Sequence, residues 1–215
     1  GPSVVLLPTT GLAEAAGVSV DPDAAGAPAA RVIRPGVARP AETPGQPLAD
    51  PEGAVCCLVI CEGQPEAAAT AMLEGLAEAR RRLPQIQLFV YSLRGDEHRL
   101  WRHARRLDLL DAFDLVAAEP GSRRLLLNVD AVVRPEPLTT VRTLTLQAMA
   151  AGRPIIAATG GVEDYLIADR TAELVEDPTP TGWAERFEAL VRDPQRYRAL
   201  GEGGREYVRE HHGLA

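Results

Sequence analysis

Five residues able to bind an anion or a sugar each follow a predicted β-strand in this 215-residue chain. They are Gly63, Arg94, Glu136, Gly160 and Gly161. Backbone amides at a Gly-Gly turn can donate to a phosphate or a sugar hydroxyl, although two glycines also suit a tight turn that holds no ligand. Arg94 has two interpretations as well, because it could supply a cation to a binding crevice or lie in solvent on a surface loop.

The three cysteines, Cys56, Cys57 and Cys61, lie within one apolar run. On a strand, Cys57 and Cys61 would share one face and Cys56 would take the other. No second cluster of ligands accompanies them, so we expect buried free thiols that pack as small apolar side chains, and no metal site. Clustered thiols without a pairing pattern favour a reducing compartment, which predicts a cytoplasmic location.

The basic residues exclude several kinds of site. All 23 are arginine, so the lysine of a P-loop, of a Schiff base and of a receiver domain is missing. The loop after the apolar run 54–61 carries no G-x-G-x-x-G pattern, and Glu62 and Glu66 would repel a phosphate there. No G-x-S-x-G elbow offers a nucleophile. We therefore predict no catalytic residue of these types and no resident cofactor.

The charge and hydropathy of the chain exclude two classes of partner. With 30 acidic and 23 basic residues, the net charge is −7. This balance disfavours nucleic acid as a partner. No apolar run approaches the roughly 18–20 residues that a transmembrane segment requires.

Strand-like and helix-like segments alternate from residue 54 onward. We expect strands at 54–61, 87–92, 113–118, 130–134, 155–158 and 172–175. We expect helices at 65–82, 96–107, 121–128, 138–151, after Gly160-Gly161, at 181–192 and at 194–211. This alternation predicts an α/β fold, a Rossmann-like doubly wound parallel sheet with helices on both faces. Ligands of such a sheet bind outside the carboxyl ends of its strands.

A composition change near residue 53 predicts two parts, an N-terminal strand and linker segment at 1–53 and the Rossmann-like domain at 54–215. Short strands are expected at 4–8 and 31–33, and the five prolines and three glycines of 34–53 favour an extended linker.

The second half of the domain resembles the carboxyl-terminal half of family-4, GT-B-type glycosyltransferases. The residues that carry the resemblance are Asp130, Pro135, Ala148–Pro154 and Thr159–Gly161. A weaker match upstream extends the resemblance over nearly the whole chain. It implies a donor half that binds a nucleotide sugar, and a partner N-terminal GT-B half that lies outside this sequence.

The chain departs from the family at the positions that hold the donor. The resemblance places the two donor-binding glutamates at Thr139 and Gln147, and the two diphosphate-binding cations at Glu62 and at Ala67 or Ala68. Glutamine can still hydrogen-bond a ribose, but without the strength of a charged acceptor. Each missing charge near a phosphate is worth roughly 4 kcal/mol at an effective dielectric constant of about 20. We therefore expect the family's usual diphosphate contacts to be lost.

Three functions stay open on these residues. The leading hypothesis is a glycosyltransferase-like domain without activity, in a structural, regulatory or weak-binding role. The first alternative is the donor half of an active retaining enzyme that uses a nucleotide-diphosphate sugar. The second is a protein-interaction module that uses the Arg-rich helix 96–107, with Leu100, Trp101, Ala104 and Leu107 on its apolar side and His98 and His103 on its surface without a matching carboxylate. A homo-oligomer is a further open partner, and His211-His212 lie at a frayed helix end.

Overall fold

The computed structural model of the chain describes residues 5–7, 30–32, 53–61, 66–92, 97–116, 123–137, 143–161 and 164–213. Six strands form one parallel sheet in the order β5-β4-β3-β6-β7-β8. They are β3 (Val55–Cys61), β4 (Ile86–Ser92), β5 (Phe113–Val116), β6 (Ala131–Arg134), β7 (Ile155–Ala158) and β8 (Ala172–Val175). The predicted doubly wound parallel sheet is confirmed.

The order of the strands reverses between β3 and β6. β3 pairs with β4 along its whole length, from Val55 opposite Ile86 to Cys61 opposite Ser92. On its other edge β3 pairs with β6. The chain thus builds β4 and β5 outward on one side and β6, β7 and β8 outward on the other. The carboxyl ends of β3 and β6 are therefore where a ligand crevice is expected.

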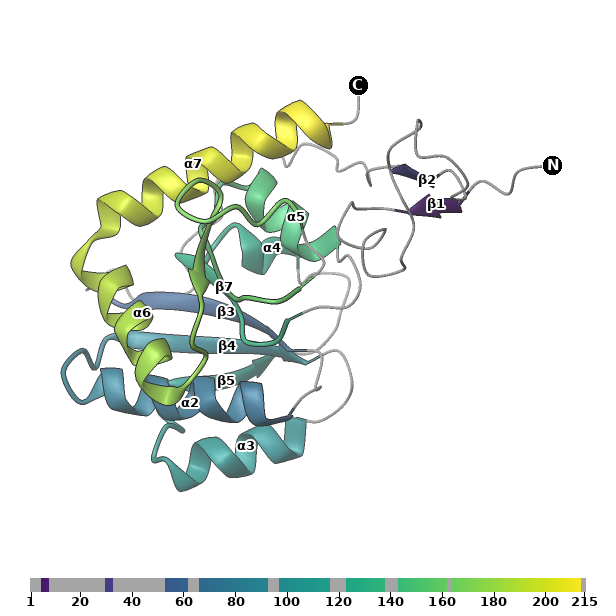
Figure 1. Cartoon of the computed structure of the whole chain (residues 1–215). Coiled ribbons are helices and arrows are strands. Elements are labelled where there is room, and N and C mark those ends of the chain that lie inside the picture. The colour runs from purple at the N-terminus through teal and green to yellow at the C-terminus, as the bar shows by residue number, and fades with distance from the viewer. Residues whose placement is uncertain are drawn as a thin grey trace.

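Helices cover both faces of the sheet (Figure 1). One face carries α2 (Glu66–Arg80), α3 (Glu97–Arg106) and α6 (Pro180–Arg192), and the other carries α4 (Arg123–Leu126) and α5 (Thr143–Ala150). The last helix, α7 (Pro194–His211), packs its first half with the first group and its second half with the second group. Cys57 and Cys61 lie in the core beneath the first group, whereas Cys56 lies beneath the second. All three thiols are free and buried, which confirms the prediction for this run.

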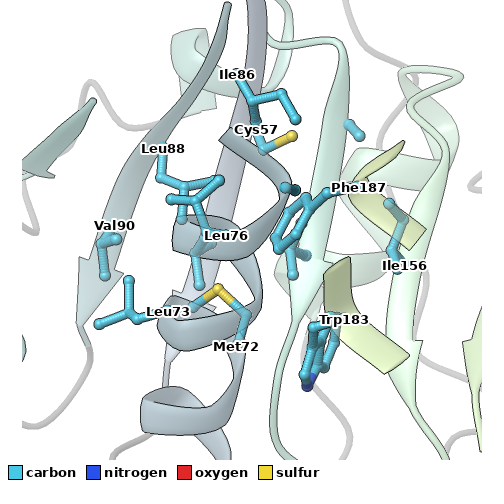
Figure 2. Close-up of a cluster of buried hydrophobic side chains, with 14 of the residues drawn as sticks. Cys57, Met72, Leu73, Leu76, Ile86, Leu88, Val90, Ile156, Trp183 and Phe187 are labelled. Atoms are coloured by element: carbon cyan, nitrogen blue, oxygen red, sulfur yellow. The ribbon is translucent and has the colours of Figure 1, made fainter. Parts of the chain in front are cut away.

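The larger core joins α2 and α6 to the sheet. Figure 2 shows Trp183 and Phe187 of α6 beside Met72 and Leu76 of α2. All four side chains are fully buried. The helices can approach closely because Gly75 of α2 has no side chain: a Cβ there would lie 2.5 Å from both the Pro180 carbonyl oxygen and Trp183 Cβ.

The two short N-terminal strands are also present. β1 (Val5–Leu7) and β2 (Ala30–Val32) pair in parallel as a separate two-stranded sheet. The linker predicted at 34–53 lies outside the described residues except for Gly53. The boundary near residue 53 stays a prediction.

The helix expected after Gly160-Gly161 is wrong for the part that the structure describes. Residues 164–171 form turns that lead directly into β8. The buried hydroxyl of Thr171 explains this, because it donates to the Tyr165 carbonyl at 2.6 Å and accepts from the Ile167 amide at 2.7 Å. A side chain that binds nearby backbone groups in this way competes with a helix.

Three surface expectations also need correction. Trp101 is 38% exposed, since it lies one helical step beyond the buried Leu100. His103 does have a carboxylate nearby, because Glu74 of the adjacent α2 places Oε1 3.6 Å from its Nε2. His212 is 2% exposed rather than frayed. Its amide continues the α7 hydrogen bonds, and its ring packs edge-on against Tyr165.

Candidate functional site

The candidate site lies at the carboxyl edge of the sheet, around the reversal of strand order. Here β3 ends at Cys61, β4 at Ser92, β6 at Arg134 and β7 at Ala158. Three of the residues expected to bind a donor, Gly63, Arg94 and Thr139, lie outside the described residues, as does Glu62. The structure therefore describes the buried residues at this edge, which we call the floor of the site, and some of the more accessible residues around them, which we call its rim.

The floor contains a buried pair of opposite charges. Arg134, at the end of β6, is 1% exposed, and Glu136, two residues further on, is 2% exposed. The Arg134 guanidinium donates to the hydroxyl of Thr145 on α5. Burial raises the pKa of the Cys61 thiol far above its ordinary range, Glu136 raises it further, and Arg134 opposes the rise. The charges of Arg134 and Glu136 therefore both affect the pKa of Cys61, the last residue of β3.

Glu136 was expected from sequence to be a donor-binding residue. The structure places it at the predicted edge, but beneath the surface, so that a ligand would have to reach the floor of the crevice to contact it. Arg134 and Thr145 were not anticipated. The available signal was an arginine at the end of the apolar run 131–134, where a side chain buried by the sheet was expected.

Gln147 lies on the more accessible side of α5. It is half-buried, while Leu146 and Ala148 on either side of it are fully buried. The exposed Thr143 lies one turn before it, so the two polar side chains share a helix face. This arrangement leaves the Gln147 amide available to a hydroxyl group.

Gly160 and Gly161 form an exposed turn after β7. Gly160 has φ +93°, a left-handed conformation that favours glycine. A Cβ at this position would meet only Pro137 Cβ, at 3.7 Å, so the backbone angle rather than lack of space requires glycine. This short distance means that the turn lies beside the segment that carries Glu136. The tight-turn interpretation is therefore supported at Gly160.

The start of α2 carries no cation at positions 67 and 68, one of which holds a diphosphate-binding cation according to the family resemblance. Ala67 is exposed and Ala68 is half-buried, and neither side chain can bind a diphosphate. Ser92, at the end of β4, is 4% exposed, and its hydroxyl finds no hydrogen-bond partner in the structure as described. Sequence reasoning missed Ser92 because a serine at a strand end gives no signal of its own.

Two searches of the described residues were negative. No three His, Cys, Asp or Glu side chains in the described part of the chain come together where a metal ion could be held. No helix within the described ranges combines the length and the apolar character that crossing a membrane would need.

Comparisons with known proteins agree on a family. The family model described as glycosyl transferases group 1 matches residues 51–207. A D-inositol 3-phosphate glycosyltransferase of Segniliparus rotundus is 26% identical over 148 residues, which cover 66% of this chain and 33% of that protein. D-inositol 3-phosphate glycosyltransferase 1 of Catenulispora acidiphila is 35% identical over 78 residues, which cover 36% of this chain and 19% of that protein. The chain spans a third or less of the length of these curated relatives.

Solved structures share the fold at low sequence identity. HepE from Anabaena, in complex with UDP and glucose, aligns with a TM-score of 0.74 and 15% identity over 98% of this chain and 59% of that chain. A glycosyltransferase from Rickettsia africae aligns with a TM-score of 0.80 and 14% identity over 99% of this chain and 60% of that one.

Proposed function

The chain belongs to the glycosyl transferases group 1 family, and from this premise we propose that it keeps the nucleotide-sugar-binding fold without catalytic activity. Its role would be structural, regulatory or weakly ligand-binding within a larger protein. The ligand class is a nucleotide-diphosphate sugar, which is consistent with the UDP bound to the structural neighbour HepE. The three free, buried thiols support a reducing, cytoplasmic compartment.

The observation that carries this proposal is the lack of charge at the start of α2. Ala67 and Ala68 occupy the positions where the resemblance places a cation on the donor diphosphate. A cation about 4 Å from a phosphate is worth roughly 4 kcal/mol at an effective dielectric constant of about 20. Losing one such contact lowers the affinity for a diphosphate by about three orders of magnitude.

The buried arginine of the floor does not replace that cation. Arg134 is fully buried and donates to Thr145, so its guanidinium stabilises the packing of α5 against β6. Taking it to a ligand would break this hydrogen bond. Gln147, where the resemblance places a glutamate, supplies a neutral amide instead. Both features favour weak binding of a donor.

Isothermal titration calorimetry with UDP-, GDP- and ADP-glucose tests the proposal. We expect no micromolar binding by the native chain. A double variant, Ala68→Lys with Gln147→Glu, should gain affinity for one of the three, and Gln147→Ala serves as the control that restores no charge. Micromolar binding by the native chain contradicts the proposed loss of donor contacts.

An active donor half is the second candidate. The accessible Gln147 and the exposed glycine turn at Gly160 favour it, because amides at both places can still bind a sugar nucleotide. A turnover assay on the full-length protein separates the two candidates. If the native protein hydrolyses a sugar nucleotide or transfers its sugar, and if this rate decreases in Gln147→Ala, the active enzyme is supported. Absence of turnover in the native protein supports the inactive domain.

A further inference from the structure

The outer face of α3 carries an unusual set of exposed side chains, which we call the basic face. It consists of Arg99, Trp101, Arg102, Arg105 and Arg106, all of them exposed. The opposite side of α3 is held in the core by Leu100 and Ala104. Because α3 lies at the margin of the molecule, beside α2 and the edge strand β5, the basic face points away from the sheet (Figure 1).

Three of these arginines lack a carboxylate partner in the described structure. Arg102 donates only to the His98 carbonyl at 3.3 Å, and Arg106 contacts His103 Nδ1 at 2.9 Å. Arg105 lies over the ring of Trp101, 5.6 Å from its centroid. All three positive charges are therefore available to an anionic group from outside the chain.

Several arginines elsewhere in the fold pair with carboxylates. Arg82 and Arg192 both pair with Glu188 at 2.9 Å, and Arg196 pairs with Glu173 at 2.6 Å. The exposed Arg209 of α7 is also paired, since it lies 3.1 Å from Glu206. The basic face differs from these places because it gathers, on one short helix, three arginines without a carboxylate partner among the described residues.

The helix α3 is positively charged although the whole chain is negatively charged. Its four arginines against Glu97 give this helix a net charge of +3, whereas the whole chain carries −7, so the rest of the chain carries −10. A long polyanion or a charged bilayer would extend beyond α3 onto a chain whose remaining residues carry net negative charge, which disfavours such a partner. A short acidic segment can contact the basic face alone, since a 10-residue helix is roughly 15 Å long.

The residue types favour a protein partner. Tryptophan and arginine are the residues most enriched at the energetic centres of protein interfaces. Trp101 is 38% exposed, and its ring is held against Arg105, so it presents a fixed apolar surface beside the charges. The apolar side of α3 is buried and therefore cannot insert into a membrane.

We propose that the basic face of α3 is a docking surface for an acidic segment of a partner protein. Carboxylates of that segment would pair with Arg102, Arg105 and Arg106, and an apolar side chain would cover Trp101. Arg102 and Arg106 lie one helical turn apart, so the surface suits acidic residues with the same spacing.

Fluorescence anisotropy with a labelled peptide of alternating Glu and Leu pairs provides the test. We expect the native chain to bind it, an uncharged Gln and Leu peptide to bind at least about tenfold more weakly, and added salt to weaken the binding. The double variant Arg102→Glu with Arg106→Glu should lose binding by about tenfold or more, and Trp101→Ala should also weaken it.

The control variant changes the same amount of charge elsewhere. Arg81→Glu with Arg198→Glu alters two exposed arginines, one in the turn after α2 and one on α7, and we expect it to bind within about twofold of the native chain. Circular dichroism checks that each variant is folded. Three results would overturn the proposal: no binding of the acidic peptide, equal losses in both double variants, or tighter binding to phosphatidylserine vesicles or RNA that the α3 variant abolishes.

Discussion

Arg134 is a buried charge with a structural hydrogen bond, whereas the accessible residues described around it at the same edge of the sheet are uncharged. A buried guanidinium is costly unless its donors are occupied, and Thr145 supplies an acceptor from α5. Glu136 places a carboxylate nearby, also buried. Ala67, Ala68 and the neutral Gln147 leave the more accessible positions without charge. At this edge of the sheet the charges of Arg134 and Glu136 are buried, whereas the accessible side chains of Ala67, Ala68 and Gln147 are uncharged.

The buried thiols predict how stability depends on pH. Burial raises the pKa of Cys56 from 9.0 to about 11, with a further rise from the nearby Asp130, and burial raises the pKa values of Cys57 and Cys61 still more. The unfolded chain therefore loses these protons before the folded chain does. The stabilisation from Cys56 is complete below pH 9.0 and is lost as the pH rises toward about 11.

Urea unfolding as a function of pH checks this expectation. The free energy of unfolding should decrease above pH 9.0, and the Cys56→Ala variant should show a shallower decrease. The raised pKa of Tyr197 adds to the loss at higher pH, and it is common to both proteins. Identical slopes in the native chain and the variant would refute the role of this thiol.

At the scale of elements, the strands were the most predictable part. The apolar run 54–61 reads as a central parallel strand because both of its faces are covered, and alternation alone assigns Cys57 and Cys61 to one face. The carboxyl-edge location of the site also follows from strand order. The helix expected after Gly160-Gly161 is replaced by turns in the described residues, and the hydrogen bonds of Thr171 that stabilise these turns cannot be read from periodicity.

Side-chain contacts between elements were harder to predict from the sequence than the positions of the helices and strands themselves. The periodicity of α3 placed Trp101 with Leu100, although a single helical step separates an exposed position from a buried one. Glu74 could not be matched to His103 because the two residues come from different helices. The hydrogen bond from Arg134 to Thr145 was hidden for the same reason, since Arg134 lies on β6 and Thr145 lies on α5.

The packing of α2 on α6 gives a prediction at this scale. In Gly75→Ala the new methyl group would lie 2.5 Å from the Pro180 carbonyl oxygen, so the helices must separate. We expect a loss of about 1–3 kcal/mol in the free energy of unfolding, measured by urea titration. In the control Gly204→Ala on α7, the nearest atoms lie 3.5 Å away. That change should be neutral or stabilise by up to about 1 kcal/mol, and equal losses in both variants would rule out the close approach as the cause.

At the scale of the whole molecule, ion pairs join the last two helices to the edge of the sheet. Glu173 of β8 is buried, and its two oxygens lie 3.1 Å from Arg186 of α6 and 2.6 Å from Arg196 of α7. Arg196 also pairs with Asp169, 2.8 Å away, in the turn before β8. A single carboxylate thereby connects three elements, and we expect the sheet and its C-terminal helices to unfold together.

The variant Glu173→Gln tests this connection. It keeps the shape of the side chain and removes the charge, while both arginines can still reach solvent. We therefore expect a loss of about 1–2 kcal/mol in the free energy of unfolding, with an unchanged m-value in urea. The matched control is Glu206→Gln, whose exposed pair with Arg209 should contribute less than about 0.5 kcal/mol. Unfolding should be followed by both circular dichroism and tryptophan fluorescence, because Trp183 reports on α6. Coincident transitions in Glu173→Gln would show one cooperative unit, whereas a separate early transition would show that α6 and α7 unfold independently of the sheet.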